Sequence, residues 1–465
     1  MIDTVSNQAE EGRLTGVASQ QRAEELRYRG HVARLYLTPR QAAVLEGQGQ
    51  TARAVWNLLH EWYTWAGHGG IAKRPSIAEI DLQLREARAN PLPGWEWLAL
   101  LPAQATQQVL RHYLRSWHRH FKGLAGPPRF KKRSSYLTVD NPQASKLRIT
   151  RLNRRWGEVT ILMVGRVRFR WTRPLPGVSP GCPGRITGAR LVKDPLGWHV
   201  SFRIEEPAVK VAANPGPPVG VDRGVVHSMA LSTGELLDMP RLLSYGEEQR
   251  LLGLERKAAR QQLAFQQRLS REPAASRSKR QRRTYQQIAG LRARQARRRE
   301  DWLHKQTTRL AKNHGVVVVE DLRIQNMTRS ARGTIDRPGR NVRAKAGLNR
   351  SILGMSWAKA GRMLAYKCPL RGGALVEVSA RNSSIECARC RGVAPENRVD
   401  QANFRCVDCG HQANCDINAA QVLLERGLTA RSGATPGCGG TAREARMLEP
   451  HREPSARHAE PTWVA

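Results

Sequence analysis

The chain has 465 residues, 40% of them hydrophobic, so it is long enough for several domains with a sizeable buried core. Lys and Arg outnumber Asp and Glu by 77 to 39, which gives a formal net charge of +38. This composition excludes a small disulfide-stapled scaffold. A folded protein with so much self-repulsion is expected to bind a polyanion, most often nucleic acid.

The sequence contains no run of eighteen apolar residues, and its N-terminus, MIDTVSNQAEEGR, has neither a basic nor an apolar segment. We therefore expect no association with membranes and a cytoplasmic protein. Four of the eight cysteines lie in two closely spaced pairs. In a reducing cytosol this spacing indicates a metal site rather than disulfides.

The first part of the chain predicts one strand followed by helices. Residues 1–28 are polar and lack apolar periodicity, so we expect a flexible leader. Residues 31–39 alternate as a strand does, and residues 40–66 and 102–121 have the apolar spacing of amphipathic helices.

Basic residues interleave with aromatic ones on the second of these helices, and more basic residues follow in the next loop. The pattern alone favours a core helix with a solvated basic face, and the net charge also supports a face that follows a phosphate backbone. The nucleic-acid contacts that we predict here are Arg111, Arg115, Arg119, Lys122, Arg129, Lys131 and Lys132.

Short alternating segments between residues 147 and 206 predict a small barrel or sandwich. Arg166, Arg168 and Arg170 would line one positive wall of it, although basic alternation also keeps an exposed face soluble. Residues 209–219 are rich in Pro and Gly, and we place a domain boundary there.

The second half of the chain predicts a mixed sheet with helices. In order, we expect a strand and hairpin (219–238), a basic helical hairpin (254–314), a buried strand (316–319), a basic loop (329–346), a helix (352–367) and a strand (374–378). The helical hairpin carries 18 Lys or Arg against 4 Asp or Glu, an excess that would repel itself without an anion nearby. The tail beyond residue 430 has no such pattern, and we expect it to be disordered.

Three acidic residues belong to separate elements of this second half. Asp222 ends the first strand, Glu320 follows the four valines of the buried strand, and Asp416 begins an apolar helix. Alone, each has an ordinary explanation, since Asp favours turns and helix caps. Together, the order strand, hairpin, helix, strand, helix, strand, helix is the ribonuclease H-like arrangement, in which three carboxylates converge. Two Mg²⁺ ions roughly 3.5–4 Å apart would offset their repulsion and support phosphodiester cleavage.

The cysteine pairs have the spacing C-x2-C-x15-C-x2-C, which fits a tetrahedral zinc site with four thiolate ligands. We interpret this zinc as structural, because four thiolates leave no open position for catalysis. His411 or Cys415 could replace one ligand, and a redox-active pair is a further alternative. The predicted zinc ligands are Cys387, Cys390, Cys406 and Cys409.

Several of these segments resemble one family. The motifs VGVDRGV (219–225), VVVEDL (317–322) and DINAA (416–420), the last preceded by the cysteine pairs, resemble the split RuvC nuclease of TnpB proteins and compact type V CRISPR effectors. Residues 348–367 resemble the helix that these proteins place before the zinc knuckle. Residues 101–123, followed by PPRFKKR, resemble their helical recognition lobe and its entry into the wedge barrel.

The resemblance implies a multidomain α+β protein with a β-barrel wedge domain, a helical recognition lobe and a ribonuclease H-like (RuvC) domain with an inserted four-cysteine zinc knuckle. The implied parts are a leader (1–28), the wedge (29–40 and 127–212), the helical lobe (41–126), the nuclease (213–380 and 415–430), the knuckle (381–414) and a disordered tail (431–465). Two residues depart from the family pattern. Arg391 replaces the usual Gly after the second zinc cysteine, and Cys415 replaces a small residue before the last acid.

The resemblance further implies an RNA-guided DNA endonuclease that recognises a short flanking motif, pairs its guide RNA with target double-stranded DNA and cleaves that DNA. Asp222, Glu320 and Asp416 would be the catalytic acids and would hold two Mg²⁺, and the four cysteines would hold one structural Zn²⁺. The chain would act as a monomer, or as a homodimer on one RNA, near the prokaryotic nucleoid. The alternatives are a guided protein that silences by occupancy and an unguided transposase or resolvase. The motifs fit a CRISPR effector and a transposon-encoded TnpB alike.

Overall fold

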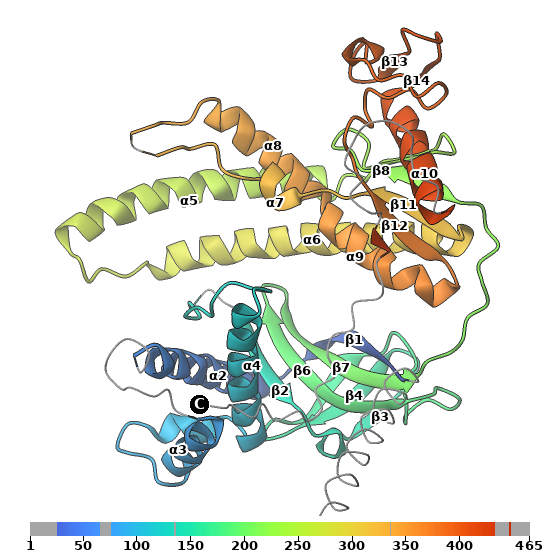
Figure 1. Ribbon diagram of the computed structural model, residues 1–465. Helices are drawn as coiled ribbons and strands as arrows, with labels where there is room; N and C mark the ends of the chain where they lie inside the picture. The colour runs from blue at the N-terminus through green and yellow to red at the C-terminus, as the bar shows by residue number, and fades with distance from the viewer. Residues whose placement is uncertain (1–25, 66–75, 134–135, 335, 433–445, 448–465) are drawn as a thin grey trace, which may run out of the picture. The chain divides into compact units, whose positions relative to one another are not determined.

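The computed structural model describes residues 26–65, 76–133, 136–334, 336–432 and 446–447. It divides the chain into two compact units, Met1–Val209 and Lys210–Ala465, which Figure 1 shows together. The division falls at the start of the linker that its Pro and Gly content predicts. Most of the predicted leader and tail lies outside the described residues.

Helices of the first unit pack around an aromatic core. They are α2 (Pro39–Trp65), α3 (Ile77–Ala89) and α4 (Ala103–Phe121), with the short 3₁₀ helix η2 (Glu96–Leu100) before α4. Tyr113 of α4 is fully buried, and Trp56 and Tyr63 of α2 meet its ring edge-on, with centroids 5.3 and 5.8 Å away. Helix α3 was not predicted, because its one buried residue, Ile80, makes a weak periodic signal.

The strands of the first unit form a seven-stranded antiparallel sheet in the order β2-β6-β7-β1-β5-β4-β3. These strands are β1 (Leu26–Tyr36), β2 (Leu137–Asn141), β3 (Ile149–Arg151), β4 (Trp156–Ile161), β5 (Gly165–Arg170), β6 (Arg185–Asp194) and β7 (Gly197–Pro207), with η3 (Ala144–Lys146) after β2. β1 starts five residues before the predicted strand, because Leu26 already pairs with Pro207 of β7. Inward side chains such as Phe169 and Phe202 are fully buried.

The second unit is built on a mixed sheet in the order β10-β9-β8-β11-β12-β15. Its strands are β8 (Val219–Asp222), β9 (Met229–Leu231), β10 (Leu236–Leu237), β11 (Val316–Glu320), β12 (Ala374–Val378) and β15 (Arg446–Met447). The central strands β8, β11 and β12 are parallel, and β15 adds two residues of the predicted disordered tail to the edge. Val317 and Val319 of β11 pack into a different cluster from Val318, so both faces of this strand are covered.

Several helices precede the C-terminal helix in the second unit, and α6 and α9 among them pack on one face of this sheet. They are α5 (Tyr245–Arg271), α6 (Lys279–Asn313), α7 (Ile324–Met327), α8 (Val342–Met355), α9 (Trp357–Lys367) and η4 (Pro369–Arg371). The predicted basic hairpin is present as α5 and α6, which lie side by side in Figure 1. The single helix predicted at 352–367 is wrong, because Ser356 has a left-handed φ of 57° and separates α8 from α9. None of the described helices is long and apolar enough to cross a membrane.

The C-terminal helix α10 (Cys415–Ser432) packs closely on the sheet, because two glycines lie in the contact. A Cβ on Gly220 of β8 would lie 2.0 Å from the carbonyl oxygen of Ala420, and one on Gly427 would lie 2.4 Å from Cγ2 of Val318. Both distances are shorter than any real contact, so a side chain at either position would push α10 away from the sheet. The knuckle before α10 contains η5 (Pro395–Asn397), β13 (Asn403–Arg405) and β14 (Gln412–Asn414).

Gly220→Ala is expected to lower the free energy of unfolding by about 1–3 kcal/mol, because the added methyl group pushes α10 away from β8. Gly253→Ala on α5, where no atom lies within 4 Å of the new Cβ, is the matched control. It should raise the free energy of unfolding by about 0.5–1 kcal/mol. Denaturant unfolding measures both, and equal effects would contradict the proposed close packing.

Candidate active site and metal centre

The three acids singled out in the sequence lie at one edge of the sheet of the second unit. Asp222 ends β8 and Glu320 ends β11, and these two strands are parallel neighbours. Asp416 lies in the first turn of α10. A Cβ added to Gly224, just after β8, would lie 3.7 Å from Oδ2 of Asp416, so this carboxylate faces the loop that follows Asp222.

Burial raises the pKa of Asp222 well above its usual value, and Glu320 adds to the shift. The negative charge of Glu320, a hydrogen bond to Glu320 and the charge of Asp416 follow burial in order of size. In its protonated form Asp222 therefore donates a hydrogen bond to the side chain of Glu320. Glu320 is itself buried, with only 7% of its surface exposed. Two ionised carboxylates at this position would repel each other strongly without a cation.

Burial also raises the pKa of Asp416, while the charges of His227 and Arg398 act in the opposite direction. The helix-cap explanation of Asp416 is wrong. Asn414 is the cap, since its Oδ1 accepts the backbone N–H groups of Asp416 and Ile417 at 3.0 and 3.3 Å. The carboxylate of Asp416 is thereby left to face the other two acids.

Arg223, which the sequence did not single out, is a buried cation at this edge. Its backbone N–H donates to Oε1 of Glu320 at 3.0 Å, and its guanidinium donates to the backbone carbonyl oxygen of Glu320. The residue is 6% exposed, and its charge interacts with Glu377, Asp222 and Asp321 as well. An Arg after a strand-ending Asp is unremarkable in so basic a chain. Its burial is the signal, and burial is not visible in the sequence.

The donor set of the three acids suits a hard divalent cation. Carboxylate oxygens are the protein ligands that Mg²⁺ prefers, and burial is the first cause of the raised pKa of both Asp222 and Asp416. The acids are less tightly grouped than the cysteines. Within the described ranges, the cysteines are the only cluster of three or more His, Cys, Asp or Glu side chains placed to hold one ion.

The sulfur atoms of the four cysteines all lie within 4.8 Å of one another. The Sγ atoms of Cys387 and Cys409 are 3.7 Å apart, and those of Cys390 and Cys406 are 3.5 Å apart. Four zinc–sulfur bonds of about 2.3 Å in a tetrahedron separate the sulfurs by about 3.8 Å, whereas a disulfide requires about 2 Å. The four residues therefore fit one zinc ion.

The two alternative ligands do not belong to this cluster. His411 lies outside it, and the Sγ of Cys415 faces the carbonyl oxygen of Asp400 at 3.5 Å. The pKa of the Cys406 thiol is lowered to about 7, first by the backbone N–H of Cys409, which favours the thiolate that zinc requires.

Polar contacts tie the knuckle to α10. The fully buried Asn418 donates through Nδ2 to the carbonyl oxygen of Glu386 at 2.7 Å and accepts from the N–H of Ala388 at 3.0 Å. Arg391 forms ion pairs with Glu386 at 2.9 Å and with Glu425. Arg391 has a left-handed φ of 68°, a conformation that Gly adopts without strain, and the two ion pairs hold its side chain.

The predicted nucleic-acid contacts of α4 share one solvated face. Three exposed arginines follow one another at four-residue spacing: Arg111, Arg115 and Arg119. The basic residues Lys122, Arg129 and Lys132, which come after them, are also exposed. Of the aromatic residues between them, Tyr113 is in the core, but Phe121 is 56% exposed. Contact of these basic residues with nucleic acid remains a prediction.

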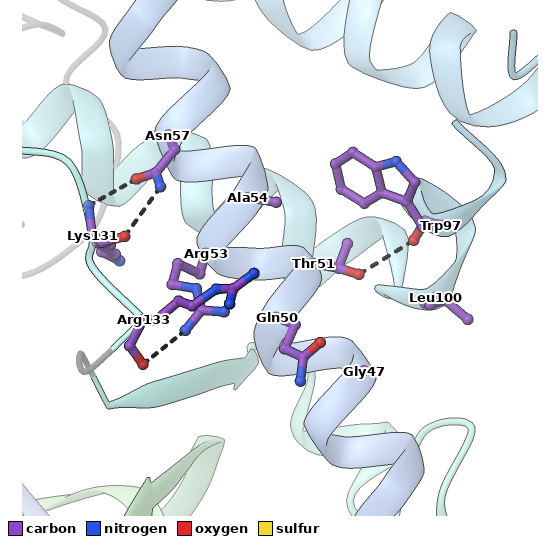
Figure 2. A pocket seen from close by; sticks show the side chains of 10 residues that line it. All are labelled: Gly47, Gln50, Thr51, Arg53, Ala54, Asn57, Trp97, Leu100, Lys131 and Arg133. Carbon is purple, nitrogen blue, oxygen red and sulfur yellow. Dashed lines mark hydrogen bonds between the residues drawn. The ribbon is translucent and has the colours of Figure 1, made fainter. Parts of the chain in front are cut away.

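Lys131 differs from these residues because it is half-buried beside a cavity of about 440 Å³ (Figure 2). Its N–H donates to Oδ1 of Asn57 at 2.8 Å, and Nδ2 of Asn57 donates to its carbonyl oxygen at 3.1 Å. Its ammonium group lies 3.9 Å from the ring centroid of Trp56. Burial, helped by the charge of Arg190, lowers the pKa of Lys131 to about 8. This lysine therefore loses charge in mildly alkaline solution.

Two segments of the chain match known families. Residues 357–423 match the family described as "Cas12f1-like, TNB domain", and residues 199–331 match the family described as "Probable transposase". The first match contains the knuckle and Asp416, and the second contains Asp222 and Glu320. The two matched segments therefore contain the three acids and the four cysteines.

Two curated proteins are similar over most of the chain. The "Putative RNA-guided DNA endonuclease InsQ" of Escherichia coli (strain K12) is 35% identical over 333 residues, 71% of this chain and 76% of that protein. A protein of Streptomyces pristinaespiralis described as "Putative RNA-guided DNA endonuclease" is 30% identical over 407 residues, 85% of this chain and 89% of that protein. The chain belongs to this family, the TnpB and compact type V family that its motifs resemble.

A solved complex of Cas12f1 with sgRNA and target DNA is a structural neighbour. It is 13% identical, covers 83% of each chain and has a TM-score of 0.47. The family assignment rests on the sequence relatives and does not depend on this similarity.

Zinc removal should destabilise the second unit, because the four thiolates would lose a binding energy on the order of 10 kcal/mol. Elemental analysis of the purified chain is expected to give one zinc per molecule, and a strong chelator should lower the melting temperature. Cys406→Ser should lower both the zinc content and the melting temperature. Cys182→Ser, outside the cluster, should change neither. A zinc content near zero in the wild type would contradict the assignment.

Asp222→Asn should stabilise the metal-free protein at neutral pH. Because the pKa of Asp222 is raised in the folded state, the unfolded chain loses this proton at lower pH, and stability falls as pH rises from about 4 towards the raised pKa. Asn keeps the shape and a donor for Glu320 without the charge, so the melting temperature should rise by about 2–4 °C.

Asp301→Asn on α6, which removes a 63% exposed carboxylate, is the control and should leave the melting temperature unchanged. Mg²⁺ should raise the melting temperature of the wild type more than that of Asp222→Asn. A variant that melts at or below the wild-type temperature without metal would show that burial of this charge is not costly.

Proposed function

We propose that the chain is an RNA-guided DNA endonuclease that hydrolyses target DNA at Asp222, Glu320 and Asp416. The observation that carries this proposal is the approach of three carboxyl groups from β8, β11 and α10 to one sheet edge, where burial and mutual repulsion raise the pKa of Asp222 and of Asp416. A protein retains so costly a grouping when a cation or a substrate completes it.

The three acids would hold two Mg²⁺ ions, which when bound supply an activated water and stabilise the leaving oxygen of the phosphodiester. Arg223 fixes the carboxylate of Glu320 through its backbone N–H. Asn414 caps α10 and leaves the carboxylate of Asp416 free. The knuckle holds the start of α10 through Asn418, so zinc acts on catalysis through position only.

Guidance by RNA is proposed from the two relatives, whose names state that function. In a guided nuclease, base pairing reads most of the target sequence, and the protein needs positive charge more than base-reading helices. The net charge of +38 fits this division. The partners would be a guide RNA and double-stranded target DNA, and the reaction would take place in the prokaryotic cytoplasm.

The finer architecture is part of this proposal. We assign the seven-stranded sheet to a wedge domain (29–40 and 127–212), helices α2 to α4 to a recognition lobe (41–126), and the mixed sheet to a RuvC nuclease (213–380 and 415–430). The knuckle corresponds to residues 381–414. The observation in its favour is that strands β2 to β7, helices α3 and α4, and the mixed sheet with its helices fall into three separate assigned parts.

A transposon-encoded role is the second candidate, since residues 199–331 match a family described as "Probable transposase". The cleavage chemistry proposed here is the same for a CRISPR effector. An unguided transposase differs in that it would cut DNA without bound RNA.

Asp222→Ala is expected to reduce cleavage of a target plasmid in Mg²⁺ by at least about 100-fold, since even outer-shell residues of metal sites cost 10–100-fold. The assay uses the full chain with the RNA that co-purifies with it, sequenced and transcribed in vitro. Asp321→Asn, which alters an exposed acid next to Glu320, is the matched control and should cleave at nearly the wild-type rate. Undiminished cleavage by Asp222→Ala would refute the site, and cleavage that survives removal of all RNA would refute guidance.

A further inference from the structure

A histidine lies on the loop that follows the first of the three acids. His227 comes five residues after Asp222, between β8 and β9. A Cβ added to Gly224 on this loop would lie 2.6 Å from the carbonyl oxygen of His227 and 3.7 Å from Oδ2 of Asp416. These two oxygens can therefore be no further apart than the two distances combined. The loop brings His227 to the edge where the acids meet.

Two contacts with the residues after β10 hold this histidine in place. Nδ1 of His227 lies 3.0 Å from Oδ1 of Asp238, and Oγ of the neighbouring buried Ser228 accepts the backbone N–H of Met239 at 2.9 Å. Because a carboxylate only accepts, Nδ1 carries the hydrogen of this bond. No residue in the described ranges pairs with Nε2, and 27% of the side chain is exposed. Nε2 is therefore the nitrogen that a ligand can reach.

The charge of His227 acts on the acid site. After burial, this charge has the largest effect on the pKa of Asp416, and it lowers that pKa. Because the energy between two charges falls with their separation, the imidazole and the carboxylate are near neighbours. A phosphodiester held at the acids would therefore lie within the field of the same imidazole.

Other basic groups at this edge keep their protons. Arg223 is buried and donates to the backbone carbonyl oxygen of Glu320. Arg398, which also acts on Asp416, donates to two backbone carbonyl oxygens of the knuckle at 3.3 and 3.4 Å. A guanidinium group does not lose its proton in a protein, whereas an imidazole binds and releases one near neutral pH. His227 is therefore the basic group here that is suited to proton transfer.

The proposed hydrolysis has a step that needs such a group. The oxygen of water forms a bond to phosphorus, and the bond from phosphorus to the leaving oxygen breaks. The electron pair of the broken bond stays on the leaving oxygen, which must take up a proton to become a hydroxyl group. A divalent cation offsets the charge on this oxygen but supplies no proton.

We propose that His227, oriented by Asp238, donates the proton on Nε2 to the leaving oxygen of the phosphodiester. The imidazole becomes neutral in this step and regains a proton from solvent afterwards. His227 is then a further catalytic residue, and Asp238 is a positioning residue that acts through it. The inference rests on the proposed nuclease function and adds one role to the same site.

The test measures single-turnover cleavage by the full chain with the RNA that co-purifies with it, transcribed in vitro. Mn²⁺ is the metal throughout, because it tolerates a neighbouring sulfur atom better than Mg²⁺ does. His227→Gln retains a polar N–H group but no transferable proton. It should slow cleavage of the natural target by about 100-fold or more, since general acids contribute about 10²- to 10⁴-fold. Its affinity for an uncleavable target should equal that of the wild type.

His314→Gln is the matched control. His314 belongs to the same unit and is half-buried like His227, and its Nδ1 lies 2.9 Å from the carbonyl oxygen of Pro217. It precedes β11, whereas Glu320 ends that strand, so it lies away from the acids. This variant should cleave at the wild-type rate.

A sulfur atom at the leaving position separates proton donation from a structural role. Two synthetic targets replace one bridging oxygen of the cut phosphodiester by sulfur, on its 3′ side in one target and on its 5′ side in the other. A thiolate leaves readily without a proton, because a thiol is far more acidic than an alcohol. On the target whose sulfur leaves, His227→Gln should cleave nearly as fast as the wild type. On the other target it should remain as slow as on natural DNA.

Asp238→Ala tests the positioning role. It should slow cleavage of the natural target, and the double variant with His227→Gln should be no slower than His227→Gln alone, because Asp238 acts through the imidazole. Asp238 is 60% exposed, so its loss should leave the melting temperature unchanged.

Three results would overturn the proposal. They are wild-type cleavage of natural DNA by His227→Gln, an equal loss of rate on all three targets, and an equal loss in the His314→Gln control. Additive losses in the double variant would overturn the role of Asp238. Asp222→Ala should cleave none of the targets, so active Asp222→Ala would refute the nuclease site itself, a result distinct from failure of His227 alone.

Discussion

Negative charge confined to a buried sheet edge is the constraint on which the second unit depends. Asp222 and Glu320 end neighbouring parallel strands, and a hydrogen bond joins their side chains. Arg223 offsets part of the repulsion from within the protein, by a backbone hydrogen bond and by its buried charge. The remainder appears as the raised pKa of Asp222. Such an edge suits divalent cations and makes a poor structural feature without them.

The third carboxylate reaches this edge from a distant part of the chain, and local chemistry determines how it is presented. Glycines at positions 220 and 427 let α10 touch β8 and β11, and the side chain of Asn414 caps the helix so that Asp416 need not. Asn418 binds the knuckle backbone one turn into the helix. The cysteine cluster therefore lies in a segment with few apolar residues, and Asn418 connects that segment to α10.

Features that depend on local pattern could be predicted from the sequence. Four valines predicted β11, and the paired cysteines predicted a cluster that the sulfur distances confirm. The order of the acids along the chain indicated that they would meet. Features that depend on tertiary contact could not be predicted. The burial of Arg223 and the break at Ser356 follow from neighbours distant in sequence or from backbone angles, which residue types do not show. The cap at Asn414 is local, and Asn is a favoured cap, so the sequence could have indicated it.

The central claim is that the three acids act together as one binding site for two divalent cations. Electron paramagnetic resonance of Mn²⁺, titrated into the full chain with its guide RNA and an uncleavable target, measures this directly. The account predicts two bound, magnetically coupled Mn²⁺ per chain in the wild type, and loss of the coupling in Asp222→Asn. Zinc-bound thiolates compete poorly for this hard ion. The same Mn²⁺ binding in both proteins would contradict the account.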